Sequence, residues 1–217
     1  MSDGMLSAAV RNNAEWCALV CRTHGVESRF EERVWRALGP PPPFYPSAIT
    51  LAPSASAADV GPAGASVKDS YATLDLDPEG FRPLFEAQWI HRAAAAPVIS
   101  GPRASRVSDP ATLGDWDAAW GGGDIFRPAL LDDPDVAVLA LHAGDTIRGG
   151  AILNRAGGVL GVSNLFGDDD DVWAAVIVAA GELFPGLDLV GYEQGDDLVP
   201  ALAAGFHPIG PLRVWIA

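Results

Sequence analysis

The stretch that most constrains the fold lies in the second half of the chain, between residues 136 and 184. It contains three apolar segments separated by the short turns "AGD" and "RAGG", a pattern that predicts consecutive strands joined by tight turns. The third segment leads into "VWAAVIVAAGELF". This run has almost no polar face, so we expect a buried helix over residues 170–184.

The rest of the second half continues the alternation of strands and helices. "LDLVGYE" predicts a strand, "DDLVPALAAG" a helix that stops at Gly205, and "FHPIGPLRVWIA" one or two final strands. A short helix is also expected in "DPATLGDWDAAW", where Asp109 precedes a proline at the first helical position. This order predicts an α/β (α+β) fold with a mixed central sheet flanked by helices.

The first half is expected to be a divergent region of helices and strands. An apolar stripe predicts a helix over residues 6–24 that ends at Gly25. "SRFEERVWRAL" predicts a second helix from Ser28. Strands are expected in "SAITL", in "SVKDSYATLDL" and after Pro83. We therefore divide the chain into an N-terminal region, residues 1–95, and a core region, residues 96–217.

Composition excludes several classes of partner. The net charge is −14, which disfavours nucleic acid and anionic membrane surfaces because both need a basic face. The two cysteines lie four residues apart with no histidine nearby, which favours reduced, buried thiols over a metal site. With no apolar leader at the start of the sequence, we expect a soluble, cytoplasmic protein. The single lysine and the many Ala, Gly, Pro and Asp residues suggest a bacterial source.

Three features stand out from about residue 136 onward. In "GGVLGVSNLFGDDDDVWAAVI" a hairpin and a strand feed a helix, "LVGYEQGDDLVPALAAGFHPIG" has a strand, a helix and a glycine–phenylalanine turn, and "PLRVWIA" is an aromatic last strand. With these features the segment resembles the C-terminal half of the GNAT superfamily of N-acetyltransferases. The match covers roughly the last 80 residues. It implies an acyltransferase that moves an acyl group from acetyl-CoA or another acyl thioester to an amine of a small molecule.

The resemblance also implies where the donor would bind. The strand before the apolar helix would hold the pantetheine arm through its backbone, and the turn after it would meet the pyrophosphate. In this sequence the implied donor-binding residues are Leu160, Gly161, Val162, Ser163, Asn164 and Gly167.

Two departures from the family pattern favour a second interpretation. The phosphate turn carries Asp168–Asp171, and carboxylates repel a pyrophosphate. These aspartates can instead cap the helix, mark a different ligand preference, or bind a metal ion. Many family members have a tyrosine where this chain has Ala201. The alternative function is therefore a non-catalytic, GNAT-like binding or regulatory protein.

Polar residues elsewhere supply the remaining candidates. Tyr192, at the end of a predicted strand, is the candidate general acid, and Glu193 the candidate general base. Asn13, Asp69 and Tyr71 are the candidate substrate-binding residues. Because successive strand residues face opposite sides, Lys68 and Asp69 cannot both reach one pocket without a bulge.

Overall fold

The described residues of the computed structural model, 2–61, 66–94, 103–167 and 171–217, form one mixed sheet of 11 strands. Its order is β1-β2-β3-β4-β11-β5-β10-β9-β8-β7-β6. β9 pairs with β10, and β3 with β4, in parallel, and all other neighbours are antiparallel. The strands are β1 (Ser28–Phe30), β2 (Val34–Ala37), β3 (Ala48–Thr50), β4 (Ser66–Asp69), β5 (Arg82–Arg92), β6 (Ser105–Arg106), β7 (Val136–Ala143), β8 (Thr146–Ala156), β9 (Val159–Gly167), β10 (Leu189–Glu193) and β11 (His207–Ile216).

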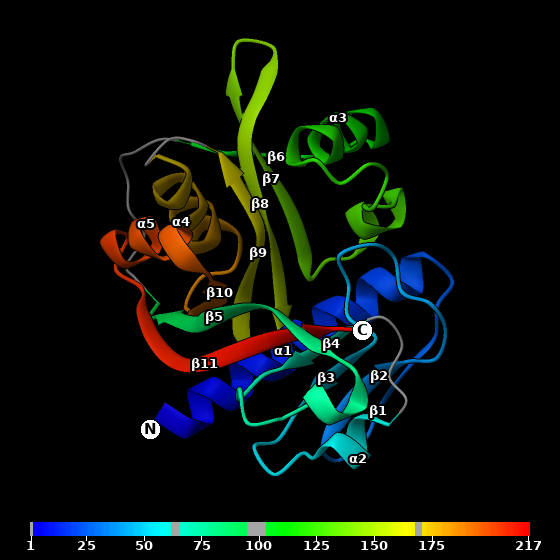
Figure 1. Cartoon of the computed structure of the whole chain (residues 1–217). Helices are drawn as coiled ribbons and strands as arrows, with labels where there is room; N and C mark the ends of the chain where they lie inside the picture. Colours follow the sequence, from blue (N-terminus) through cyan, green and yellow to red (C-terminus); the bar gives the residue numbers. More distant parts are fainter. Residues whose placement is uncertain (1, 62–65, 95–102, 168–170) are drawn as a thin grey trace.

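Helices cover both faces of the sheet. Figure 1 shows α4 and α5 on one side of strands β7–β9 and α3 on the other, with the long α1 crossing behind the sheet. The α-helices are α1 (Ser2–Thr23), α2 (Ala57–Val60), α3 (Pro110–Trp120), α4 (Asp171–Leu183) and α5 (Leu198–Ala203), and the short 3-10 helices are η1 (Asp77–Glu79), η2 (Pro128–Asp132) and η3 (Gly195–Asp197).

Alternation along the buried strands creates two separate cores. In β7, Val136, Val138 and Ala140 pack in the core that contains α1 and α3. The intervening Ala137 and Leu139 pack in the core that contains α4. Because successive side chains of a strand point to opposite faces, this continuous apolar run serves both layers.

The predicted elements of the second half are confirmed. α3 begins at Pro110, and the side chain of its N-cap residue, Asp109, accepts a hydrogen bond from the Thr112 amide. β7, β8, β9, α4, β10, α5 and β11 follow in the expected order. α4 is apolar on nearly all sides because it packs between the sheet and the end of the chain. Trp173 of α4 contacts the Phe206 ring at 4.8 Å. α4 is therefore covered by residues near the C-terminus, whereas α1 packs on the opposite face of the sheet.

One expected helix is absent. Residues 28–37 form the hairpin β1–β2 instead of a helix. Val34 and Trp35 are almost completely buried, and β2 pairs with β3. Burial of a β-branched residue and an aromatic residue in a sheet outweighs the local helical pattern here, since β-propensity depends on the packing that a strand finds.

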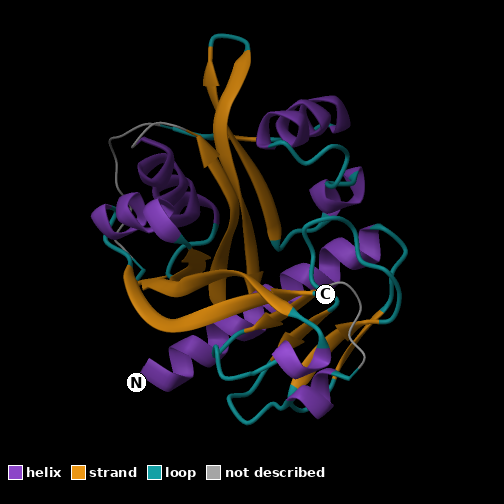
Figure 2. Ribbon diagram, viewed as in Figure 1, coloured by secondary structure: helices purple, strands orange, loops and turns teal. Residues whose placement is uncertain are grey.

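β5 joins the two predicted regions of the chain. It lies between β10 and β11, antiparallel to both, and Figure 2 shows β5 and β11 curving together as a long pair of strands. Residues 1–95 therefore supply a strand to the interior of the sheet that residues 96–217 build.

Candidate functional site

The parallel strands β9 and β10 separate after a short paired segment. Their ladder joins Leu189 to Leu160 and Val190 to Gly161, and no later pair is formed in the described chain. β9 also has a bulge where it pairs with β8. The segment from Ser163 to Phe166 in β9 lies opposite the shorter segment from Gly150 to Ile152 in β8. A bulge increases local twist and bends its strand, so the β10-facing edge of β9 is left open beyond this point.

Asn164 lies in the bulge with a left-handed backbone. Its φ is +54°, a conformation that asparagine tolerates better than most residues other than glycine. The side-chain Oδ1 of Asn164 is buried and has no hydrogen-bond partner in the described residues. An unpartnered buried oxygen is uncommon in proteins and is expected where a ligand binds.

A cavity of about 290 Å³ opens where β9 and β10 separate. The side chains that line it come mainly from the two separating strands, from α1 and from the loop before β3. Tyr192 and Glu193 both line the cavity although they are consecutive residues of β10. Its lining residues are Asn13, Trp16, Cys17, Phe44, Tyr45, Pro46, Lys68, Phe85, Trp120, Val162, Ser163, Asn164, Leu165, Tyr192, Glu193, Gln194 and Asp197.

Three polar side chains from distant parts of the sequence meet at the cavity wall. The Lys68 ammonium donates to Asn13 Oδ1 at 2.8 Å and to the Tyr192 hydroxyl at 3.3 Å. It also lies 4.4 Å from the centre of the Tyr192 ring, in cation–π geometry. Because the Tyr192 oxygen accepts from Lys68, the phenol can direct its own proton elsewhere, including into the cavity.

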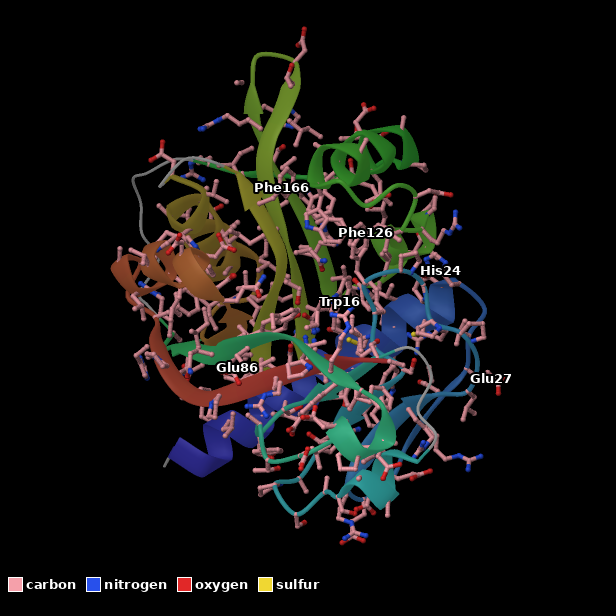
Figure 3. All side chains as sticks on the ribbon, in the orientation of Figure 1. Trp16, His24, Glu27, Glu86, Phe126 and Phe166 are labelled. Atoms are coloured by element: carbon pink, nitrogen blue, oxygen red, sulfur yellow. The ribbon has the colours of Figure 1, made fainter. Side chains whose placement is uncertain are left out.

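The aromatic surroundings hold Tyr192 and the cavity wall in place. Trp89 packs edge-on against Tyr192 with ring centres 5.5 Å apart, and its indole nitrogen donates to the Ser70 carbonyl. On the other side of the cavity, Trp16 stacks on Phe126 at 6.3 Å, next to α3 (Figure 3). Such ring pairs contribute roughly 0.5–1.5 kcal/mol each beyond simple burial.

Glu193 has an unusual carboxyl group. Burial, together with the neighbouring carboxylate of Asp197, raises the pKa of Glu193 to about 8. Both effects oppose the charged form. A carboxyl whose pKa lies near neutrality can both accept and return a proton, which an ordinary surface glutamate does poorly.

Burial acts differently on the Lys68 ammonium. Desolvation favours loss of its proton, but attraction by Tyr192 and Cys17 in their anionic forms and the hydrogen bond to Tyr192 outweigh it. The pKa of Lys68 is therefore raised. The side chain is only 5% exposed.

Two of the predicted substrate-binding residues do not line the cavity. Asp69 is 0% exposed and accepts hydrogen bonds from the Leu74 amide at 2.8 Å and from the Thr50 hydroxyl, so it holds the turn after β4. Tyr71 donates its hydroxyl to the Leu51 carbonyl. β4 ends at Asp69, and Lys68 faces the cavity with Asp69 on the opposite side, as strand alternation predicts.

The predicted donor-binding residues of β9 divide into two groups. Val162, Ser163 and Asn164 line the cavity, as Asn13, Tyr192 and Glu193 also do. Leu160 and Gly161 lie before the separation, in the segment paired with β10. A Cβ on Gly161 would collide with the side-chain amides of Asn12 and Asn154, which explains glycine at this position.

Lys68 and Tyr45 were not among the sequence-based candidates. Tyr45 lines the cavity, and its buried hydroxyl lies beside Trp16 and Asn164 but donates its proton to no acceptor in the described residues. Burial, together with Cys17 and Tyr192 nearby, raises its pKa well above the ordinary value, so the phenol remains a donor. The available signal for Lys68 was that it is the only lysine of the chain, placed inside a strand.

Comparison with known proteins adds the family context. No family model matches the chain, and the curated proteins contain no significant match. A GCN5-related N-acetyltransferase from Kribbella flavida superposes with a TM-score of 0.63 at 14% identity, over 96% of this chain and 95% of that protein. The chain has a GNAT-like fold. The resemblance inferred from the last 80 residues is thus confirmed at the level of the fold, across almost the whole chain.

Two further structures show the same GNAT-like fold. A protein assigned to the GNAT family of acetyltransferases, from Novosphingobium aromaticivorans, gives a TM-score of 0.57 at 11% identity, over 92% of this chain and 94% of that one. A conserved protein of unknown function from Staphylococcus epidermidis gives 0.62 at 11% identity, over 86% and 91%.

The structure describes the two departures from the GNAT pattern, the aspartate run and Ala201, to different extents. Asp168, Asp169 and Asp170 lie outside the described residues, whereas Asp171 is the first residue of α4 and Gly167 ends β9 with φ +127°. Ala201 is 0% exposed and packs in the core around α4. It is not among the residues that line the cavity.

Two features are absent from the residues that the structure describes. No helix there combines the length and the apolar character needed to cross a membrane. Within the same ranges, no three His, Cys, Asp or Glu side chains are grouped to hold a metal ion.

Proposed function

We propose that the protein is an N-acyltransferase that moves an acyl group from a coenzyme A thioester to an amine of a small molecule. The observation that supports this most is the open edge of β9 beyond Gly161, beside a cavity lined by Tyr192 and Glu193. An unpaired strand edge offers amide donors and carbonyl acceptors to an extended ligand. Pantetheine is extended and contains two amide groups, so it suits such an edge.

In this proposal the thioester is a substrate that supplies the acyl carbonyl. The amine nitrogen forms the new C–N bond, and the C–S bond breaks. Glu193 in its carboxylate form accepts the proton that the nitrogen loses, and Tyr192 donates its hydroxyl proton to the departing sulfur. The larger contribution of the chain is to hold donor and amine together in the cavity.

Tyr192 is suited to this role by its hydrogen bond with Lys68. The ammonium donates to the phenol oxygen at 3.3 Å, and a nearby positive charge stabilises the negative charge that the oxygen acquires when it gives up its proton. The buried Ala201 cannot provide an acid. Of the two tyrosines that line the cavity, Tyr192 is the one whose oxygen accepts a hydrogen bond from Lys68.

A second candidate function, ligand binding without turnover, is favoured by the aspartate run after Gly167. Carboxylates at the start of α4 weaken the attraction of a helix N-terminus for a pyrophosphate. In this second function the chain would bind its ligand in the same cavity and along the same open strand edge, but it would release no thiol.

Titration calorimetry with acetyl-CoA, followed by a thiol-release assay with a panel of small amines, tests the proposal. We expect binding, and amine-dependent thiol release that falls about 100-fold in Glu193→Gln. Binding without thiol release would favour the second candidate. No binding by acetyl-CoA or longer acyl-CoAs would overturn the proposed function.

A further inference from the structure

Lys68 is a buried basic side chain without a carboxylate partner in the described residues. It is 5% exposed, and its hydrogen bonds go to two neutral oxygens, Asn13 Oδ1 and the Tyr192 hydroxyl. No ion pair among the described residues includes it. Burying an uncompensated charge is costly, and proteins usually pair it or neutralise it.

Lys68 faces the cavity and keeps hydrogen-bonding capacity. An ammonium has three donors, and the two protein acceptors use two of them. The Tyr45 hydroxyl, which lines the same cavity, is buried beside Trp16 and Asn164 and donates its proton to no acceptor in the described chain. One cation and one phenol donor thus meet at the cavity wall, a combination that suits an anionic oxygen.

The charge of this cavity favours an anion with a single negative charge. Glu193 and Asp197 also line it, and the whole chain carries a net charge of −14. A phosphate dianion would meet one basic side chain, the Asp197 carboxylate and the Glu193 carboxyl, whose pKa is already raised. A carboxylate needs only one cation and two or three donors, which Lys68 and Tyr45 provide.

The cavity continues into a larger apolar groove of about 890 Å³. Lys68, Tyr45, Phe85 and Trp120 line both spaces. The groove adds the run Pro40–Pro43 and other apolar side chains, with a rim that includes Phe44 and Leu84. Phe44 is 74% exposed and Leu84 51%.

The proline run gives this groove a stiff wall. Consecutive prolines restrict the backbone to extended conformations, and Phe44, immediately after them, stacks edge-on against Trp120 at 5.6 Å. A wall that loses little entropy on binding is suited to an apolar ligand. Pockets for small molecules commonly combine such a surface with a few polar groups.

We propose that the acceptor is a small amine that carries a carboxylate and an apolar body, with the carboxylate bound by Lys68 and the apolar body in the groove of Pro40–Pro43, Phe44 and Phe85. This assignment of the acceptor rests on the proposed acyl transfer. The anion site itself does not depend on turnover, so binding alone tests it.

N-acetylated amino acids with apolar side chains are suitable probes, because each has the form of a reaction product. Calorimetry compares N-acetyl-leucine, N-acetyl-phenylalanine and N-acetyl-tryptophan with the corresponding amides, which lack the negative charge. In the unaltered protein we expect at least one free acid to bind about 10- to 100-fold more tightly than its amide, the effect of a charge-assisted pair at a buried site.

The variant Lys68→Met should abolish this preference, and Lys68→Arg should keep part of it. Arg103→Met is the matched control, because it removes one positive charge from an exposed ion pair with Glu182 and should leave the preference unchanged. Equal binding of acids and amides by the unaltered protein, or no binding of either, would overturn the proposal without any variant being made.

The acetyl-CoA titration separates this inference from the proposed function. A preference for free acids with no affinity for acyl-CoA would leave the anion site in place and overturn the acyl transfer. Acyl-CoA binding and turnover of uncharged amines, with no preference for acids, would support the acyl transfer and overturn the assignment of the acceptor.

Discussion

Glu193 places a carboxyl group of raised pKa in the cavity. A carboxylate with an ordinary pKa would be too weak a base there. Because its pKa is raised to about 8, the side chain is mostly protonated at neutral pH and becomes an efficient acceptor as the pH approaches 8. We expect kcat/KM to rise with pH and to show an inflection near 8 that is missing in Glu193→Gln. An inflection retained by the variant would point to the amine substrate.

The same residue predicts a change of stability with pH. Between pH 4.5, its usual pKa, and about 8, the folded protein binds a proton that the unfolded chain releases. Folding is therefore progressively disfavoured as the pH rises through this window. Measured by thermal melting, the Tm of the unaltered protein relative to Glu193→Gln should fall from pH 4.5 to 8 and then level off. Glu32→Gln, at an exposed glutamate, should show no such trend.

Tyr192 is tested by removing one oxygen. Tyr192→Phe keeps the ring that packs on Trp89 and removes the hydroxyl that accepts from Lys68. If Tyr192 is the acid, turnover should fall by about 100-fold while acetyl-CoA affinity, measured by calorimetry, stays within about twofold. Unchanged turnover would assign the hydroxyl to packing and to the support of Lys68.

At the scale of elements, α1 is fixed to the sheet by a pair of asparagines. The Asn12 amide donates to the Asn154 carbonyl at 3.0 Å and to the Ala156 carbonyl at 3.2 Å, and the Asn154 amide donates to Asn12 Oδ1 at 3.1 Å. This contact places the next residue, Asn13, at the cavity. The site therefore depends on how closely α1 approaches β8 and β9.

Gly161 permits that approach. In Gly161→Ala the new Cβ would collide with both asparagine side chains, so we expect a loss of about 1–3 kcal/mol in the free energy of unfolding, measured by urea denaturation. Gly114→Ala is the matched control, because a Cβ there meets nothing within 4 Å inside α3 and should stabilise by about 0.5–1 kcal/mol. Equal effects at the two sites would contradict this account of α1 docking.

At the scale of the whole molecule, β5 makes the two halves of the chain interdependent. Without it, β10 and β11 would each lose a partner along their length, and Ile90 would leave the core around α4. We expect a fragment of residues 96–217 to be aggregated or to unfold without a cooperative transition. Co-expression with residues 1–95 should restore a folded complex. A fragment that melts cooperatively alone would show that the core is complete without β5.

The sequence by itself determined the elements whose signals are local. Turns with glycine and the alternation of apolar residues placed β7, β8 and β9, and an apolar run placed α4. Strand alternation also separated Lys68 from Asp69. These predictions hold because side-chain period, capping and turn geometry are set within a few residues.

Tertiary structure decided the features that need contacts between distant segments. The hairpin of residues 28–37 depends on the burial of Trp35 and on pairing with β3. β5 joins the sheet interior because β10 and β11 both offer free edges. The site brings Asn13, Lys68 and Tyr192 together from α1, β4 and β10. No local pattern encodes such a meeting, since its free energy comes from burial and pairing that exist only once the sheet has formed.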